Sequence, residues 1–400
     1  MRILVADKFP EPGIEALREL GCEVTCDPDL KEAGLGEALE GEAPEILIVR
    51  STKVNLAHLE ASPRLALVIR AGAGVNTIDV AAASERGVYV ANCPGKNSVA
   101  VAELAFAHIL AADRRLVDGA QDLREGRWNK KGYSRARGIK GTTLGLLGLG
   151  KIGLEMIPRA QAFGMRVVAW SRSLTPERAE ELGVDHADSP AAVASEADVL
   201  SVHTALTADT RGLVNEGVLA ALRPGALLVN TSRDAVVDQA ALVRAIEERG
   251  LRAALDVFEG EPAGGAGEVD SELFRFPGVQ GSHHIGASTE EAQLAVASEA
   301  VRIVRGMIQE GRVYNCVNLA ERTPATHLLV VRHRDEVGVL AGVLERVRSA
   351  GINVQEMENV VFLGARAACA RIQLDGEPPR GTLGEIEGAE HVLAVSVTSL

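Results

Sequence analysis

The amino-acid sequence predicts an α/β protein with two doubly wound parallel sheets, followed by a smaller domain of four strands and two helices. Across residues 1–287, short apolar runs of strand length alternate with amphipathic helical patterns, which is typical of parallel βα units. The chain has 400 residues, which is too long for one ordinary core and favours two or three domains. From about residue 325 the pattern becomes β-α-β-β-α-β, the order of a ferredoxin-like domain.

The first sheet is predicted near the N-terminus and the second in the middle of the chain. Long helices are expected at 98–124 and 288–309, and the second of these is expected to return to the first sheet. We therefore expect a discontinuous first domain of residues 1–97 and 288–318, a second domain of residues 98–287, and a small domain of residues 325–400.

A glycine-rich stretch organises the second domain. Gly148, Gly150 and Gly153 stand in G-x-G-x-x-G spacing between an apolar strand at 143–147 and a helix that begins near residue 152. A second buried strand at 165–170 closes a βαβ unit, and this context makes the motif much more specific than the glycines alone. We expect Gly148 to make the turn, Gly150 to admit a pyrophosphate and Gly153 to let the helix pack closely on the strand. The stretch predicts a Rossmann dinucleotide-binding domain, with the helix N-terminus facing the phosphates.

Three polar residues follow later strands of the same predicted sheet: Arg233, Glu261 and His284. The carboxyl ends of parallel strands meet at one edge, where ligands of open α/β sheets bind. Histidine is the best general base near neutral pH, a carboxylate fixes its tautomer, and an arginine clamps a substrate carboxylate. The set predicts hydride transfer between a 2-hydroxy acid and a nicotinamide. Asp256 is a candidate partner for the nicotinamide carboxamide.

Two arginines of the first domain also follow strands. Arg50 lies in VRSTK, and Arg70 opens RAGAGVN, where glycines leave the backbone open. Ligands of open α/β sheets bind outside the carboxyl ends of strands, so both arginines are placed to bind an anion.

Composition limits the other classes of function. The net charge of −13 argues against binding to nucleic acid or to anionic membranes. Five scattered cysteines predict a reducing, cytoplasmic location rather than a disulfide framework, and no Cys/His set with zinc spacing is present in the sequence. The N-terminus MRILVADKF is expected to be a strand rather than a signal peptide, and no apolar run is long enough to span a bilayer.

The motifs VRSTKV, RAGAGVN, NCPGKNSVAVAEL, LGLLGLGKIG, NTSRDAVVD, ALDVFEGEP and HHIGAST together resemble the D-isomer-specific 2-hydroxyacid dehydrogenase family. The resemblance covers almost the whole chain. It is strongest to members that oxidise 3-phospho-D-glycerate to 3-phosphohydroxypyruvate in L-serine biosynthesis and carry a C-terminal ACT domain. It implies a flavodoxin-like substrate domain and a Rossmann domain, joined by the two long helices as a hinge.

The resemblance also implies roles for individual residues. Arg233, Glu261 and His284 match the family's catalytic set. The substrate residues are Arg50, Ser51, Arg70, Gly72 and Asn76, with Lys130 or Lys131 added across a dimer. The cofactor residues are Gly148, Gly150, Lys151, Ile152, Gly153, Ser171, Arg172, Thr204, Thr231, Ser232, Asp256, Gly286 and Ala287.

The sequence departs from the family at two places near these sites. His283 stands where the family has proline before the catalytic histidine, and we interpret it as a bystander. Ser171 stands where an acidic residue usually binds the adenosine ribose, and Arg172 follows it. An acidic residue there favours NAD, whereas an arginine accommodates a 2′-phosphate, so NAD is the family expectation and NADP stays open.

The small domain resembles ACT domains, which pair their sheets and bind amino acids at the interface. By that resemblance, His333, Asp335 and Asn353 are candidate residues for an L-serine effector. Asp335 replaces a usual asparagine and Val337 a usual proline, so a purely assembly role stands beside the effector role. The chain is expected to form a homodimer or homotetramer.

Two other functions stay open at this stage. One is a glyoxylate or hydroxypyruvate reductase, or another D-2-hydroxyacid dehydrogenase, which the Ser171–Arg172 pair mildly favours. The other is an NAD(H)-sensing binding protein like the family's corepressor relatives.

Overall fold

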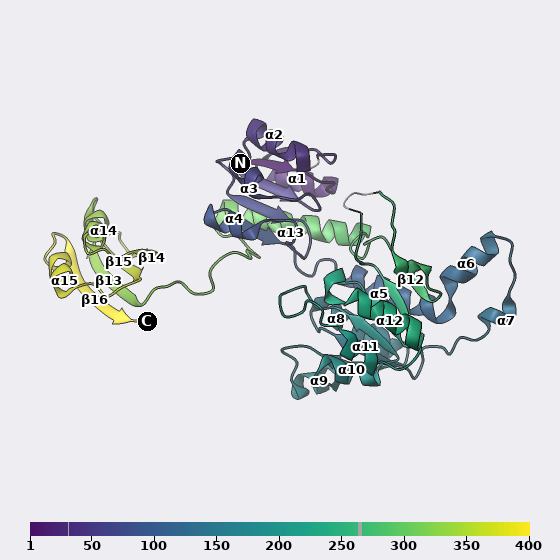
Figure 1. Ribbon diagram of the computed structural model, residues 1–400. Coiled ribbons are helices and arrows are strands. Elements are labelled where there is room, and N and C mark those ends of the chain that lie inside the picture. Colours follow the sequence, from purple (N-terminus) through teal and green to yellow (C-terminus); the bar gives the residue numbers. More distant parts are fainter. Residues whose placement is uncertain (31, 263–265) are drawn as a thin grey trace. The chain divides into compact units, whose positions relative to one another are not determined.

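The computed structural model describes residues 1–30, 32–262 and 266–400, and it contains three sheets (Figure 1). The chain divides into two compact units, Met1–Asn318 and Leu319–Leu400. The first unit holds two parallel sheets and the second a four-stranded antiparallel sheet. The predicted fold class is therefore confirmed.

The N-terminal sheet has five parallel strands in the order β2-β1-β3-β4-β5, which is a flavodoxin-like order. The strands are β1 (Arg2–Val5), β2 (Glu23–Cys26), β3 (Ile46–Val49), β4 (Leu67–Arg70) and β5 (Tyr89–Asn92). The connecting helices are α1 (Glu11–Glu19), α2 (Glu32–Glu42), α3 (Leu56–Ala61) and α4 (Val80–Glu85). β3 is buried along its whole length, as expected for a central strand covered on both faces.

The second sheet has seven parallel strands in the order β12-β11-β10-β9-β6-β7-β8. The strands are β6 (Thr143–Leu147), β7 (Arg166–Trp170), β8 (Asp185–His186), β9 (Val199–Val202), β10 (Leu227–Asn230), β11 (Arg252–Leu255) and β12 (Val279–Gly281). The helices are α5 (Ser98–Arg114), α8 (Lys151–Ala162), α9 (Pro176–Leu182), α10 (Pro190–Glu196), α11 (Glu216–Ala221) and α12 (Gln239–Arg249), with 3-10 turns at Asp234–Val236 and Glu272–Arg275. The strand order reverses between β6 and β9, and a crevice for ligands forms at such a switch point.

The expectation of one continuous helix at 98–124 is wrong, because α5 ends at Arg114 and a second helix begins after Arg115. That residue has a left-handed backbone with φ of 51°, and α6 (Leu116–Arg124) begins after it. The buried face of α5 ends at Ala112, and within the described part of the chain α6 buries none of its residues. Beyond the core, packing no longer holds the helix straight. Residues 116–133, including α7 (Lys130–Tyr133), form an arm that extends from the seven-stranded sheet (Figure 1).

α13 (Glu290–Glu310) returns to the N-terminal sheet, where Val296, Ala300 and Val304 pack in one cluster with Ile3 and Ile48. In Figure 1, this green helix lies along the purple N-terminal sheet. The chain thus crosses between the two sheets of the first unit twice, through the loop before α5 and the loop before α13.

Glu299 of α13 connects this helix to the loop before α5. Its side chain is 7% exposed and accepts from Arg302 at 2.6 Å, Asn315 at 2.7 Å and Lys96 at 3.1 Å. The hydrogen bond from Arg302, helped by Asn315 and Lys96, lowers the pKa of Glu299 to about 2. Lys96 lies in the loop before α5, so the carboxylate fixes that loop to α13.

We predict that Glu299→Gln lowers the free energy of unfolding at pH 7 by about 2 kcal/mol, the usual value for hydrogen bonds to a charged group. The folded pKa lies below that of the unfolded chain, so the wild-type advantage is complete above about pH 4.5. It shrinks as the pH falls toward 2. Urea unfolding at pH 7 and pH 3.5 checks this; a difference that grows on acidification would contradict it.

The second unit folds as β-α-β-β-α-β, with sheet order β14-β15-β13-β16. Its elements are β13 (His327–Arg334), α14 (Val339–Ser349), β14 (Val354–Val361), β15 (Ala367–Leu374), α15 (Arg380–Glu387) and β16 (Val392–Ser399). Leu329, Val331 and Ile372 form its core with both helices. In the described parts of both units, every helix is too short or too polar to cross a membrane.

Candidate active site

The glycine turn follows β6 and is shaped by close backbone contacts. Gly148 has φ of 96°, and a Cβ there would lie 2.9 Å from the carbonyl group of His203. A Cβ on Gly153 would lie 2.2 Å from the Gly148 oxygen, so only glycine lets α8 approach the turn. A Cβ on Gly150 would meet no described atom within 4 Å. Open space over the first residues of α8 fits a pyrophosphate.

Two buried hydroxyls lie at the carboxyl ends of neighbouring strands, on the same side of the sheet as the glycine turn. Thr204 follows β9 and Thr231 follows β10, and neither Oγ1 has a hydrogen-bond partner within the described residues. Buried hydroxyls are normally paired, so these two suit a polar ligand. The hydroxyl of Ser232, in contrast, already bonds to Asn230 Oδ1 at 2.9 Å. Together with the glycine turn, this pattern fits a bound dinucleotide.

The remaining predicted cofactor residues lie on several elements. Lys151 is the first residue of α8 and donates to the carbonyl of Pro94 at 3.0 Å, so it binds the loop before α5. Ile152 packs against the core under α8. Ser171 and Arg172 follow β7, and Arg172 pairs with Asp209 at 3.1 Å, with both side chains largely exposed. Ala287 O accepts from Gln293.

We predict that Gly153→Ala and Gly150→Ala separate folding from cofactor binding. Gly153→Ala should lower the melting temperature, since its methyl group collides with backbone. Gly150→Ala should leave the melting temperature within about 2 °C and weaken NADH binding roughly tenfold or more, because its methyl group occupies the open space. Thermal unfolding and NADH fluorescence titration measure the two effects. Equal NADH affinity in Gly150→Ala and wild type would contradict the assignment.

His284 and Glu261 form the pair that the sequence predicts. His284 Nδ1 lies 2.8 Å from Glu261 Oε2, and the other carboxylate oxygen accepts the backbone N–H of Phe258 at 2.9 Å. With Nδ1–H donating to the carboxylate, Nε2 carries the lone pair. His284 is half-exposed, so that lone pair is accessible. The neighbouring His283 is exposed and lies outside this pair.

The loop that carries His284 is anchored by Asp256, which is 1% exposed at the end of β11. Its carboxylate accepts from Ser282 Oγ at 2.6 Å and from the N–H groups of Ile285 and Gly286 at 2.9 and 2.8 Å. Asp256 thus holds the loop, and its predicted contact with the nicotinamide carboxamide stays a prediction.

Arg233 follows β10 and is held by Asn230, a residue that the sequence analysis missed. Asn230 Nδ2 donates to the carbonyl of Arg233 at 2.9 Å and is itself fully buried. Burial lowers the pKa of Arg233, against the opposing charges of Glu261 and Asp234. A Cβ built on Gly74 would lie 2.8 Å from Arg233 Nη2, so this guanidinium faces the loop after β4.

Arg50 and Ser51 follow β3 and are positioned by Asp7, also missed in the sequence. The Asp7 carboxylate accepts the N–H groups of Arg50 at 2.7 Å and Ser51 at 3.1 Å, and the Ser51 hydroxyl at 2.7 Å. The Arg50 guanidinium donates to Ser288 Oγ at 3.3 Å, just before α13. Burial lowers the pKa of Arg50, and Asp7 opposes that effect.

Arg70 ends β4 and lies against Gly72, where a Cβ would lie 1.7 Å from the guanidinium. Burial, followed by the charges of Arg233 and Arg50, lowers the pKa of Arg70 to about 10. Its Nε is buried without a partner in the described structure. Asn76 is exposed on the same loop, with Oδ1 near Gly74. The structure therefore gathers three arginines from two sheets at one place.

Comparisons with known proteins assign this arrangement to a family. Residues 106–286 match the family model "D-isomer specific 2-hydroxyacid dehydrogenase, NAD binding domain". A glyoxylate reductase of Thermococcus litoralis is 35% identical over 74% of this chain and 90% of its own length. The chain belongs to the D-isomer-specific 2-hydroxyacid dehydrogenases. The glycine turn and the pair of Glu261 and His284 lie within the matched NAD-binding region.

Two further similarities are to a curated relative and to a solved structure. The D-3-phosphoglycerate dehydrogenase of Archaeoglobus fulgidus is 37% identical over 81% of this chain. This chain spans 60% of the length of that relative. The solved structure of the TT0316 protein from Thermus thermophilus covers 79% of this chain and all of its own, with a TM-score of 0.70 and 35% identity.

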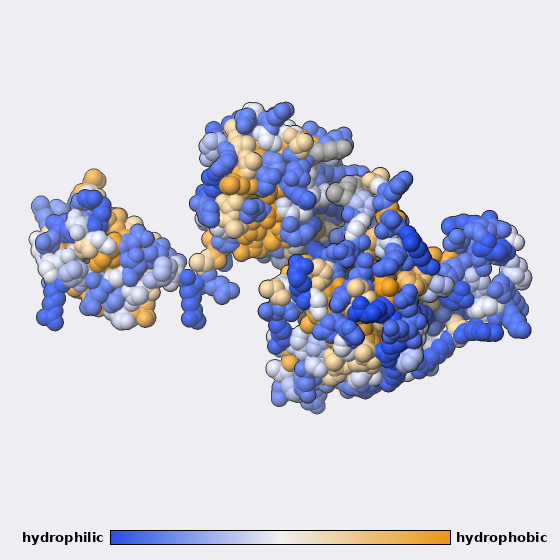
Figure 2. Space-filling model, in the orientation of Figure 1, coloured by the Kyte–Doolittle hydropathy of each residue, from blue (hydrophilic) through white to orange (hydrophobic). Residues whose placement is uncertain are grey.

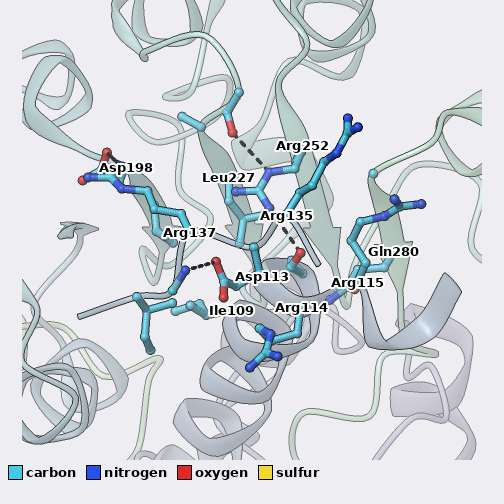
Figure 3. A pocket seen from close by; sticks show the side chains of 18 of the residues that line it. Ile109, Asp113, Arg114, Arg115, Arg135, Arg137, Asp198, Leu227, Arg252 and Gln280 are labelled. Carbon is cyan, nitrogen blue, oxygen red and sulfur yellow. Dashed lines mark hydrogen bonds and ion pairs between the residues drawn. The ribbon is translucent and has the colours of Figure 1, made fainter. Parts of the chain in front are cut away.

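A cavity of about 800 Å³ lies away from the dehydrogenase site (Figure 3). Residues at the amino ends of β9 to β12 line it, among them Asp198, Leu227 and Arg252, whereas the site residues follow the carboxyl ends. Figure 3 shows several arginines around this cavity. In the described ranges of the chain, no group of three or more His, Cys, Asp or Glu residues is placed to hold a metal ion.

The predicted effector residues do not meet within one copy of the second unit. His333 is 1% exposed, with ring nitrogens near Arg334 O at 2.6 Å and Asn359 Oδ1 at 3.2 Å. The register pairs His327 with Leu374 and His333 with Ala368, while Asn353 precedes β14 beside Leu374. His333 and Asn353 are thus roughly 20 Å apart along the sheet. Asp335 lies just past β13.

Proposed function

We propose that this 2-hydroxyacid dehydrogenase oxidises 3-phospho-D-glycerate to 3-phosphohydroxypyruvate with NAD⁺, the first committed step toward L-serine. The observation that carries the proposal is the convergence of Arg50, Arg70 and Arg233. Like charges that are partly buried repel one another and lose solvation, and a ligand with two anionic groups offsets both costs. A phosphorylated hydroxy acid has a carboxylate and a phosphate.

The site residues divide the chemistry between them. NAD⁺ supplies the hydride acceptor when it is bound. His284 Nε2 accepts the proton of the substrate hydroxyl, and Glu261 holds the ring and stabilises the imidazolium that forms. Arg233 holds the substrate carboxylate and polarises the carbonyl in the reverse direction. Arg50 and Arg70, on the other sheet, hold the phosphate.

The similarity to phosphoglycerate dehydrogenases supports this substrate, and the catalytic pair argues for turnover rather than for NAD(H) sensing alone. His284→Asn should therefore abolish turnover and keep NADH binding. Turnover by that variant at the wild-type rate would contradict the role of His284.

We predict that Arg50→Ala and Arg70→Ala each lower kcat/KM for phosphohydroxypyruvate by roughly 10- to 150-fold, the range for a hydrogen bond to a charged group. The same variants should change kcat/KM for glyoxylate by less than about threefold, because glyoxylate has no phosphate. Reductase assays with both substrates measure the split. Arg18→Ala removes an exposed arginine of α1 in the same sheet domain and serves as the control. Equal losses on both substrates would contradict a phosphate site.

A second candidate is a glyoxylate or hydroxypyruvate reductase, which the Thermococcus litoralis relative favours. If the protein is such a reductase, smaller 2-oxo acids should be the better substrates. It also leaves the arginines of the N-terminal sheet without a second anion to bind.

For the cofactor, NAD is the expectation of the matched domain, and we propose that Arg172 admits NADP as well. Its ion pair with Asp209 joins two exposed side chains and is weak, so the guanidinium is available to a 2′-phosphate. Arg172→Gln should weaken NADPH binding several-fold and leave NADH binding within twofold. Parallel binding titrations of this variant with NADH and NADPH measure the difference. An equal loss of affinity for both nucleotides would contradict the proposed contact of Arg172 with the 2′-phosphate.

We further propose that the active form contains at least two copies of the chain. The arm looks mainly hydrophilic in Figure 2, yet Trp128, Leu123 and Leu116 expose 79%, 60% and 58% of their surface. Large apolar side chains exposed on one segment suit a contact surface, and the same arm carries Lys130 and Lys131. Serine binding likewise needs two copies, since one copy separates the effector residues. Light scattering reports the mass, and a monomer at working concentration would contradict the proposal.

The location that fits the sequence is the cytoplasm. All five cysteines are free, as expected in a reducing compartment. Localisation of a tagged chain in its own cells tests it.

A further inference from the structure

A buried histidine of α5 is hydrogen-bonded to the loop that carries His284. His108 is 7% exposed, and its Nε2 lies 2.9 Å from Ser282 Oγ. Ser282 Oγ donates in turn to Asp256 Oδ1 at 2.6 Å. On the other side of the ring, Gln280 Nε2 lies 3.2 Å from His108 Nδ1 and 2.9 Å from the carbonyl of His108.

The chemistry of these groups fixes the direction of each hydrogen bond. A carboxylate only accepts, so the Ser282 hydroxyl gives its proton to Asp256. Its oxygen must therefore accept from His108, which makes Nε2 the protonated nitrogen. Nδ1 then carries the lone pair and accepts from Gln280, whose second proton goes to the carbonyl of His108. Every polar atom of the His108 ring is satisfied by the neutral form, and burial, which lowers the pKa of His108, favours that form.

The far end of this chain of hydrogen bonds is the backbone of the catalytic loop. Asp256 accepts the N–H groups of Ile285 and Gly286, and its own carbonyl accepts the N–H of His284 at 3.0 Å. His284 has a left-handed backbone with φ of 53°, a strained conformation for a residue other than glycine. Such a conformation persists only where the surrounding bonds hold it.

We propose that His108 is a positioning residue for His284. It acts through Ser282 and Asp256 and keeps the strained loop in the one conformation that presents Nε2 of His284 to the substrate. The catalytic part of this inference rests on the proposed function, in which His284 moves the proton. Gln280 lines the cavity in Figure 3, so the same chain of bonds connects the wall of that cavity to the catalytic loop.

Two substitutions separate the hydrogen bond from the volume of the ring. His108→Leu fills the space and removes both ring contacts. His108→Gln keeps a side-chain N–H for Ser282 and an oxygen for Gln280, so it should restore what leucine loses. His58→Leu is the matched control, because His58 is equally buried in α3 and uses both ring nitrogens, at Asn55 and Glu32, far from the catalytic loop.

Amide hydrogen exchange measures the loop without reference to activity. In His108→Leu, exchange of Ile285 and Gly286 should rise roughly two- to tenfold, the change expected for one lost hydrogen bond, and should return toward wild type in His108→Gln. Unchanged exchange at these amides, or a uniform rise across the first unit as for a merely destabilised fold, would overturn the proposal. This readout is valid even if phosphohydroxypyruvate is not the substrate.

Kinetics test the catalytic part. His108→Leu should lower kcat roughly 10- to 100-fold, as misplaced catalytic groups do, with KM for the oxo acid changed less than about threefold because the arginines stay in place. His108→Gln should recover most of kcat, and His58→Leu should keep it. If His108→Leu shows faster amide exchange at Ile285 and Gly286 but keeps the wild-type kcat, His108 does not position His284 for catalysis, and the proposal is overturned. A wild-type protein inactive on every oxo acid would instead refute the proposed function and leave the exchange result to decide the structural part.

Discussion

The burial of three guanidinium groups close to one another is the constraint on which the site depends. Arg50 and Arg70 come from the five-stranded sheet and Arg233 from the seven-stranded sheet, and burial with mutual charge lowers the pKa of Arg70 to about 10. Asp7 lies near Arg50 and is already committed to the backbone after β3, and Glu261, which lies near Arg233, is paired with His284. The positive charge is therefore left for a ligand to balance, although the chain as a whole carries −13.

Hydrogen bonds at the strand ends hold the loops that bring these arginines close together. Asp7, Asn230 and Asp256 are each located at or just past the end of a strand. Asn230 holds the loop that follows its own strand, whereas Asp7 and Asp256 hold the loops that follow the neighbouring strands β3 and β12, in each case through backbone N–H or C=O groups. The loops carry Arg50, Arg233 and His284. The same architecture places two threonine hydroxyls that have no hydrogen-bond partner among the described residues at the proposed cofactor part of the site, and the three arginines at the proposed substrate part.

Much of the fold and of the candidate site can be predicted from the sequence, because both depend on local sequence patterns. Strand and helix alternation predicts the two parallel sheets, and the spacing of Gly148 to Gly153 predicts the turn. The pair of Glu261 and His284 follows from their positions after neighbouring strands. The break at Arg115 was not predictable, since apolar periodicity continues through it and only the end of the buried face stops the helix. His108 and Asn230 were missed because a buried polar residue on an apolar pattern shows its partner only when distant segments meet.

The central claim is that the arginine cluster selects a phosphorylated substrate. The most direct measurement is the ratio of kcat/KM for 3-phosphohydroxypyruvate to that for hydroxypyruvate, taken on the wild-type protein with saturating NADH. Two additional charge-assisted contacts predict a ratio above about 10². A ratio near or below one would contradict the account and favour a reductase of small oxo acids.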